Sequence, residues 1–391
     1  MNLQHSDSSS SDVLVIGGGV MGCAAAYHLA KRGQRVALLE QFQIGHTHGS
    51  SHGPSRVIRL NYEGVDYVEL ARAAYAHWHA LEADCGKKLL FYTGGMDIGE
   101  PAALAGMASS LQAANVAFEM IDSAEIMRRS PQMRVPEGMI ALFQNDYGVL
   151  LADPCLAEMS RLASQYGATI YESEQVQQIV PEGTGVRVQT QRTTYHAERV
   201  IITAGAWMRP LLRPLGVDLP LTVVKETIAY YKPADPTPFL PERFPLFLQR
   251  FPNSTMIGCA FPLINHEGVK MIYDRIGKVI DPADQDDSIS QEQFARIRDY
   301  TKQVLPNLGD NVIETATCRY TMTPDEDFII DYLPSYSQIV IGSPCSGHGF
   351  KFGIIIGKIL AELAVDGKTE HNIQRFKLDR PALTSGEEWK L

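Results

Sequence analysis

The chain of 391 residues is 45% hydrophobic and 20% charged, which indicates a folded globular protein with room for two domains. Its formal net charge of −10 disfavours a surface that binds nucleic acid or an anionic membrane. The six cysteines are scattered without a CxxC pair, a pattern that favours free thiols in a reducing compartment.

The two ends of the chain bear on its location. The N-terminal MNLQHSDSSSSD is polar and serine-rich, so we expect a disordered tail over 1–11 and not a signal peptide. No run of eighteen uninterrupted apolar residues occurs, so we expect no transmembrane helix. The C-terminal Trp389-Lys390-Leu391 only loosely matches a peroxisomal address. We therefore predict a cytoplasmic protein that contacts no membrane.

The first element after the tail is an apolar run over 13–16, typical of a buried parallel strand. A phosphate-binding glycine motif, an alanine-rich helix over 23–31 and a second strand over 35–39 follow. The motif glycines are Gly17, Gly19 and Gly22, and the second strand ends at Glu40. Glycines allow the tight turn, the helix N-terminus offers amides to a pyrophosphate, and an acid in this place can bind ribose hydroxyls. The segment predicts a dinucleotide site, with FAD or NAD favoured over NADP because Glu40 disfavours a 2′-phosphate.

A second turn close to the dinucleotide is predicted later in the chain. Residues 167–200 alternate like a pair of hairpins, and the strand over 198–207 ends in a small-residue turn at Gly205. Alone, 198–207 is equally consistent with any core strand. Its place after the glycine motif favours the FAD-binding fold of the glutathione reductase type, and we assign Val176 and Gly205 to the cofactor site.

The last third of the chain contains three further elements. Lys270 lies in an apolar strand, which favours an inward-pointing side chain over a snorkelling surface lysine. A strand is predicted over 313–320, followed by a turn at Pro324-Asp325 and a second strand from Phe328. A glycine-rich loop then enters a helix over 350–363.

Three blocks, 38–59, 318–331 and 346–363, resemble the monomeric sarcosine oxidase family, which also contains N-methyltryptophan oxidase and L-pipecolate oxidase. The likeness extends over almost the whole chain, and the SSHG and LEQF pieces look most like the pipecolate oxidase branch. The resemblance implies a covalent bond between a cysteine sulfur and the 8α carbon of FAD, and that cysteine falls on Cys318. We expect the cation of the adjacent Arg319 to help form the thiolate. The alternatives are a buried structural thiol, or attachment at Cys345.

The resemblance also implies roles for several cations. Oxidation of an amino acid requires that its carboxylate be anchored, and a forked guanidinium suits this task. The matching motifs assign the carboxylate to Arg59 and Lys351, and place Arg56 and His52 near the flavin ring. Lys270 matches the lysine that lies against the flavin and activates oxygen, because a cation stabilises superoxide.

The glycine-rich loop at the end of the chain belongs to the same predicted site. Gly347 and Gly349 flank His348, and the N-terminus of the following helix would face the electron-rich end of the isoalloxazine. His348 would serve this region, with a structural histidine as the alternative.

Two positions depart from the sarcosine oxidases. Asp274 stands where they carry a histidine, and a tyrosine that lines their substrate cavity is replaced near Cys259. These changes alter charge and volume at the side-chain end of the pocket. We therefore expect a different side-chain preference, toward cyclic or basic amino acids.

The predicted fold is α/β, with a glutathione-reductase-type FAD-binding domain and a substrate domain on a mixed, largely antiparallel sheet. The FAD-binding domain is predicted over 12–85, 146–218 and 318–383, and the substrate domain over 86–145 and 219–317. We predict a monomeric oxidase that converts a secondary or N-methyl amino acid and dioxygen to an imine and hydrogen peroxide, without a metal. The alternatives are a dehydrogenase that passes electrons to a carrier, and a non-catalytic flavoprotein subunit.

Overall fold

The computed structural model describes residues 10–252, 254–284, 286–343 and 346–390, so most of the predicted tail and Cys345 lie outside the described residues. The chain divides into two compact units. The first contains the chain up to His52, Asp153–Val223 and Tyr320–Lys390, and the second contains Gly53–Ala152 and Val224–Arg319. No helix in the described ranges is long and apolar enough to cross a membrane.

The first unit is built on a mixed sheet in which β1 lies between β12 and β2. Its strands are β1 (Ser10–Ile16), β2 (Val36–Leu39), β9 (Thr169–Tyr171), β10 (Val176–Glu182), β11 (Gly185–Thr190), β12 (Thr194–Ile202), β19 (Ile329–Leu333) and β20 (Tyr336–Ser343). β1 runs parallel to both β12 and β2, as the apolar run predicts for a buried strand. Ser10 and Ser11 were expected in the tail, but they belong to β1 because their backbone pairs with His196 and Ala197 of β12.

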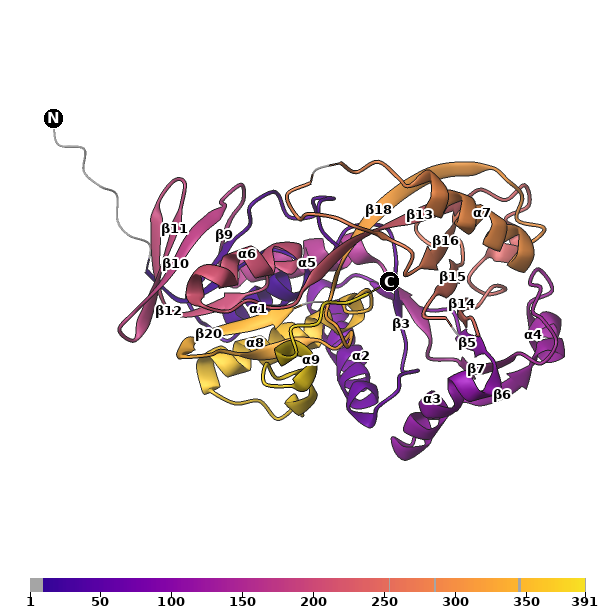
Figure 1. Ribbon diagram of the computed structural model, residues 1–391, viewed down its shortest axis with the longest axis horizontal. Helices are drawn as coiled ribbons and strands as arrows, with labels where there is room; N and C mark the ends of the chain where they lie inside the picture. Colours follow the sequence, from indigo (N-terminus) through magenta and orange to yellow (C-terminus); the bar gives the residue numbers. More distant parts are fainter. Residues whose placement is uncertain (1–9, 253, 285, 344–345, 391) are drawn as a thin grey trace. The chain divides into compact units, whose positions relative to one another are not determined.

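Two of the helices of the first unit pack against each other. The helices are α1 (Val20–Lys31), α5 (Ala152–Gln165), α6 (Met208–Leu212), α8 (Gly353–Asp366) and α9 (Pro381–Thr384), with 3-10 turns η1 (Gly205–Trp207), η2 (Arg213–Leu215), η4 (Phe350–Phe352) and η5 (Gln374–Phe376). α8 packs closely on α1 (Figure 1), since a Cβ at Gly353 would lie 2.4 Å from Val20 and a Cβ at Gly357 would lie 2.4 Å from Ala24. The small residues of both helices therefore fix the position of the loop that precedes α8.

The second unit is built on a larger sheet and a small three-stranded one. The larger sheet contains β5 (Gly95–Gly99), β6 (Glu119–Asp122), β7 (Ile140–Gln144), β13 (Thr222–Tyr231), β14 (Leu246–Arg250), β15 (Ile257–Phe261), β16 (Val269–Asp274), β17 (Lys278–Val279) and β18 (Val312–Met322). β14 runs parallel to β5, whereas β14, β15, β16 and β13 follow one another antiparallel. The prediction of a mixed, largely antiparallel sheet is confirmed.

The small sheet explains a difference from the predicted domain boundaries. It contains β3 (Arg56–Ile58), β4 (Leu90–Tyr92) and β8 (Gly148–Leu150). The helices of the second unit are α2 (Val65–Cys85), α3 (Pro101–Ala113), α4 (Ser123–Arg129) and α7 (Gln291–Val304), and η3 (Thr237–Phe239) is a 3-10 turn. Residues 53–85 and 146–152, which we expected in the FAD-binding domain, belong to the second unit. The reason is that β3 and β4 both pair with β8, and α2 packs on α3.

Candidate functional site

The glycine motif forms the turn between β1 and α1 in the first unit. Gly17 has φ +99°, and a Cβ there would lie 2.6 Å from the carbonyl oxygen of Thr203. A Cβ at Gly22 would lie 1.8 Å from the carbonyl oxygen of Gly17, so any larger residue would open the turn. The turn is closed by the hydroxyl of Thr203, which donates to the carbonyl of Gly17 (2.9 Å). Gly205, the other glycine assigned to this region, has φ +51° and begins η1 directly after β12.

Glu40 closes the same turn from the end of β2. Its carboxylate accepts hydrogen bonds from the amides of Gly18 (2.7 Å) and Phe42 (2.8 Å). Burial raises the pKa of Glu40, although these amides oppose the shift. At the N-terminus of α1, Gly19 provides no side-chain cap and the first turn contains no acid, while the amide of Val20 donates to the hydroxyl of Ser51 (3.0 Å). The positive end of the α1 dipole and the buried Glu40 therefore lie at the same turn. A bound dinucleotide uses the first for its pyrophosphate and the second for its ribose.

The loop before α8 holds the second set of predicted residues. Gly347 has φ +77°, and a Cβ there would lie 2.7 Å from the ring of Tyr320. The ring of His348 stacks on Phe328 at 4.8 Å, and its Nε2 donates to the carbonyl of Glu326 (3.1 Å). These contacts hold the ring of His348 in the loop, and its role beside the flavin stays a prediction. Lys351 in η4 is 2% exposed, and its Nζ donates to the carbonyl of His348 (2.6 Å).

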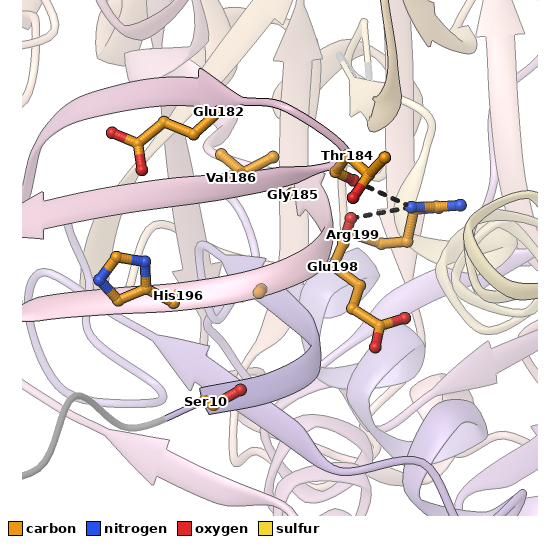
Figure 2. A pocket seen from close by; sticks show the side chains of 9 residues that line it. Ser10, Glu182, Thr184, Gly185, Val186, His196, Glu198 and Arg199 are labelled. Carbon is orange, nitrogen blue, oxygen red and sulfur yellow. Dashed lines mark hydrogen bonds between the residues drawn. The ribbon is translucent and has the colours of Figure 1, made fainter.

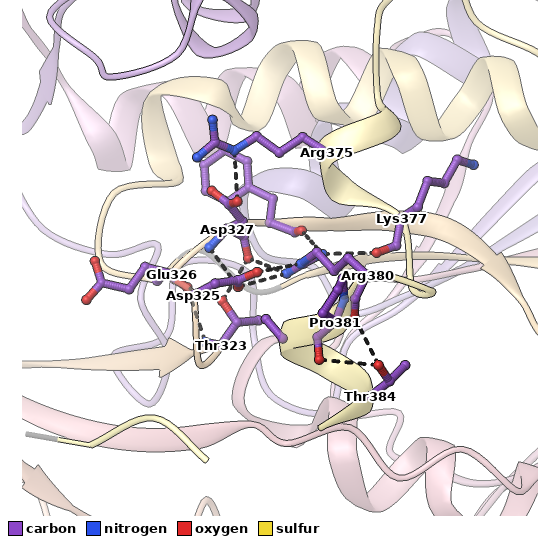
Figure 3. Close-up of polar contacts among 12 residues, drawn as sticks. Thr323, Asp325, Glu326, Asp327, Arg375, Lys377, Arg380, Pro381 and Thr384 are labelled. Atoms are coloured by element: carbon purple, nitrogen blue, oxygen red, sulfur yellow. Dashed lines mark hydrogen bonds and ion pairs between the residues drawn. The ribbon is translucent and has the colours of Figure 1, made fainter. Parts of the chain in front are cut away.

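The C-terminal segment holds the turn over 323–327 in place (Figure 3), and the carbonyl of Glu326 in this turn accepts from His348. Arg380 forms an ion pair with Asp325 (2.7 Å) and donates to the carbonyl of Phe328 (2.8 Å). Trp389 is buried, and its indole nitrogen donates to the side chain of Glu326 (3.2 Å). A continuous set of contacts therefore runs from the end of the chain through Glu326 and His348 to Lys351. No local sequence pattern predicted this support.

Two further predicted residues, Val176 and His52, lie in the first unit. Val176 begins β10 and packs half-buried against the apolar core of the unit. His52 is half-buried at the end of the first segment.

The second unit brings Cys259, Lys270 and Asp274 onto one face of the larger sheet. The cross-strand pairs are Asp97–Leu248, Leu248–Cys259, Cys259–Ile272 and Ile272–Ile228. Paired residues point to the same face, and side chains alternate along each strand, so Lys270 and Asp274 lie on this face as well. The opposite face carries the apolar core with α7. We call the first face the polar face of the sheet.

Cys318 lies beside two cations of this unit. The guanidinium of Arg56 is 3.9 Å from its sulfur, and Arg56 (2.9 Å) and Lys270 (2.9 Å) both donate to the carbonyl of Ser55. Burial raises the pKa of the Cys318 thiol, and the charges of Arg56 and Lys270 oppose that rise. Lys270 is 3% exposed and lies 4.7 Å from the ring of Phe261, so the prediction of an inward-pointing lysine is confirmed.

The expectation that Arg319 assists Cys318 is wrong. Adjacent residues of a strand point to opposite faces, so the two side chains of β18 diverge. Arg319 is 2% exposed and donates to Asp287 (3.2 Å) and to the carbonyl of Pro282 (3.2 Å). The cation beside the sulfur is that of Arg56, which comes from a distant part of the sequence.

Arg59 is buried beside an aspartate that sequence reasoning missed. Its Nη1 donates to the carboxylate of Asp97 (3.2 Å) and to the carbonyl of Asn61, and its guanidinium lies 4.5 Å from the ring of Tyr62. Burial opposes the charge, but Asp97, Tyr147 and Tyr62 hold the pKa of Arg59 above its ordinary value. The Nε of Arg59 is buried without a hydrogen-bond partner within the part of the chain that the structure describes.

A second acid on the polar face, Glu226, was also missed. Glu226 lies two residues before Ile228 and Asp274 two residues after its partner Ile272, so the two acids lie on the same face near the end of this ladder. Burial and the charge of Asp274 raise the pKa of Glu226 to about 8, against the amides around Gly277. Cys259 lies nearby, and burial raises the pKa of its thiol to about 12.

The first unit also has a shallow cleft of about 530 Å³ between the start of β1 and the hairpin of β11 and β12 (Figure 2). Its polar contacts are local, since Arg199 donates to the carbonyls of Glu198 (2.9 Å) and Thr184 (3.5 Å). None of the predicted site residues lines this cleft.

The comparisons with known proteins agree on the kind of protein that this chain resembles, an oxidoreductase. Residues 12–363 match the model of a family described as FAD dependent oxidoreductase. The chain is 34% identical to the monomeric sarcosine oxidase of Bacillus sp. (strain B-0618), covering 96% of this chain and 97% of that protein. It is 32% identical to the N-methyl-L-tryptophan oxidase of Salmonella arizonae, covering 94% and 98%. A solved structure of NikD, titled an unusual amino acid oxidase essential for nikkomycin biosynthesis, has a TM-score of 0.84 at 28% identity and covers 95% of this chain and 98% of that one.

Proposed function

The chain belongs to the FAD dependent oxidoreductase family, and from this premise we propose that it oxidises a secondary or N-methyl amino acid with dioxygen and releases hydrogen peroxide. The resemblance to the sarcosine oxidase family is confirmed, as are an FAD-dependent enzyme and its fold class. The likeness to the pipecolate oxidase branch, the cytoplasmic location and the monomeric state stay predictions.

The nucleotide turn of the first unit fits FAD. The space at Gly17 and Gly22 admits no side chain, the N-terminus of α1 carries no acid, and Glu40 is held at the end of β2. Bound FAD would supply the two-electron acceptor for the C–H bond beside the amine. The chain's own residues then have to orient the substrate, hold the cofactor and stabilise the charge that reaches oxygen.

The observation that carries the proposal is the state of the Arg59 guanidinium. One of its nitrogens donates to acceptors of the protein, and another is a buried donor without a partner among the described residues. Asp97 and the carbonyl of Asn61 fix Nη1, while the buried Nε has no partner among the described residues. A carboxylate that accepts from Nε would satisfy this donor without moving the side chain. Lys351, the second predicted carboxylate ligand, is fixed by the carbonyl of His348.

We assign the other two cations to the cofactor and to oxygen. Arg56 lies 3.9 Å from the sulfur of Cys318 and favours its thiolate, which supports covalent attachment of FAD at this cysteine. Lys270 keeps a buried positive charge beside Ser55, where it would stabilise superoxide.

The test is reduction of the flavin under anaerobic conditions by an N-methyl amino acid, followed by admission of air. We expect bleaching by the acid, no bleaching by the matching amine without its carboxylate, and hydrogen peroxide once air enters. A reduced flavin that transfers electrons to a quinone and yields no peroxide would establish the dehydrogenase alternative. Absence of reduction by any secondary or N-methyl amino acid would contradict the proposed function.

A further inference from the structure

The carboxylate site proposed at Arg59 contains an acid that should cancel much of its charge. Asp97 is fully buried, and its carboxylate lies 3.2 Å from Nη1 of Arg59. A guanidinium and a carboxylate in contact form a neutral pair, and a neutral pair attracts an anion only weakly. An effective anion site at Arg59 therefore needs a further positive charge close to Asp97.

Arg250 provides a second guanidinium on the polar face of the sheet. Leu248 of β14 pairs with Asp97 of β5, and Arg250 lies two residues farther along β14, so its side chain is on the same face. The Nη2 of Arg250 lies 3.9 Å from Oδ1 of Asp97. The aspartate that holds Arg59 is thus also close to a second cation.

The two oxygens of Asp97 have different surroundings. Oδ2 accepts from Nη1 of Arg59 (3.2 Å), from the side-chain amide of Asn61 (3.0 Å) and from the hydroxyl of Tyr147 (3.2 Å). Oδ1 lies 3.3 Å from the same Nη1 and is the oxygen closest to Arg250. One oxygen therefore orients Arg59, while the other interacts with the charge of Arg250.

The charge of Arg250 is not used up by other groups. Its Nη2 lies 3.9 Å from the sulfur of Met107, which is a weak acceptor, and its Nε is buried without a hydrogen-bond partner among the residues that the structure describes. The side chain is 29% exposed, so water screens its charge only in part. Burial raises the pKa of Tyr62 to about 12, against the charges of Arg59 and Arg250. The field of Arg250 therefore extends to the ring that lies beside Arg59.

We propose that Arg250 is a positioning residue of the carboxylate site: it balances Asp97, so that Asp97 can orient Arg59 without cancelling the charge that holds the substrate carboxylate. The three side chains together carry one positive charge, which matches one carboxylate. Lys270 and Asp274, on β16 of the same face, add one charge of each sign. The inference rests on the proposed function, because it takes Arg59 as the ligand of that carboxylate.

The first experiment removes the charge of Arg250 and measures the binding of hexanoate, a carboxylate that cannot be oxidised, by calorimetry. Arg250→Gln should weaken hexanoate roughly tenfold, the effect of a unit charge about 6–8 Å away in a partly solvated site. KM for an N-methyl amino acid should rise by the same factor with kcat unchanged, because Arg250 does not touch the reacting atoms. Arg128→Gln removes an equal charge from an exposed ion pair with Glu125 and should leave hexanoate binding unchanged.

Two further variants separate an effect of charge from an effect of structure. Arg250→Lys keeps the charge and should bind hexanoate about as tightly as wild type. Asp97→Asn in the Arg250→Gln background removes one negative charge along with the positive one, so the cluster again carries one positive charge. The affinity of this double variant for hexanoate should return close to that of wild type, which a merely structural role of Arg250 does not predict.

Unchanged hexanoate binding in Arg250→Gln would overturn the inference. So would a tenfold loss in Arg250→Lys, or a double variant that binds hexanoate as weakly as Arg250→Gln does. Thermal unfolding shows which variants are folded, and Arg250→Lys decides the question by itself if Arg250→Gln does not fold. Failure of every N-methyl amino acid to reduce the flavin would instead refute the proposed function, while the hexanoate titrations still decide the role of Arg250.

Discussion

Replacing Asp97 by asparagine tests whether Arg59 is held in place by a buried ion pair. Asp97 is fully buried, and its carboxylate accepts from Arg59 (3.2 Å), Asn61 (3.0 Å) and Tyr147 (3.2 Å). Asparagine keeps the shape but removes the charge, which leaves the guanidinium of Arg59 buried without an anion. Loss of one partner of such a pair costs about 3–5 kcal/mol, because the remaining charge has no compensation. We expect the free energy of unfolding of Asp97→Asn to fall by this amount.

The assay is urea unfolding of wild type and variant, with an exposed ion pair as the control. Arg32 and Asp366 also form a two-pronged pair (2.7 Å), but both side chains are well exposed. Asp366→Asn should therefore cost no more than about 1 kcal/mol. Hexanoate should stabilise Asp97→Asn more than wild type, since the added carboxylate replaces the missing charge. An Asp97→Asn variant as stable as Asp366→Asn would refute the reasoning.

Four further predictions concern the other parts of the site. Cys318→Ser should release all FAD into the supernatant on acid precipitation, whereas wild type should stay yellow; equal release from both would exclude attachment at this residue. Lys270→Met should keep anaerobic reduction but slow reoxidation by air about 10²–10³-fold, as stopped-flow absorbance would show, and equal losses in both half-reactions would contradict its role toward oxygen. Burial and the charge of Asp274 raise the pKa of Glu226 to about 8, so wild type should lose stability as pH rises from the group's ordinary pKa of 4.5 through 8, whereas Glu226→Gln should not; urea unfolding at pH 5 and pH 9 measures the difference, and the same pH dependence in both proteins would contradict the shift. Trp389→Phe keeps an aromatic ring but removes the hydrogen bond to Glu326, which supports His348 and Lys351. It should weaken the binding of hexanoate roughly fivefold and leave the rate of flavin reduction at saturating substrate unchanged. A loss of thermal stability without a change in affinity would exclude a role for Trp389 in positioning Lys351.

Local patterns predicted the nucleotide turn well, because its requirements lie within a few residues. Gly17 and Gly22 permit one backbone path, and the apolar run before them suits only a buried strand. The same local reasoning failed at Arg319, where proximity in sequence suggested a partner for Cys318. Alternation along β18 separates the two side chains, and the cation near the sulfur comes from β3.

The missed residues depend on strand pairing. Asp97 has no motif around it, and it becomes part of the site only because β5 lies next to β14 and Arg59 follows β3. Glu226 is equally inconspicuous within a strand of buried residues, and only the pairing of β13 with β16 shows that it shares a face with Asp274. Register between distant strands is a tertiary property, and no single-segment pattern contains it.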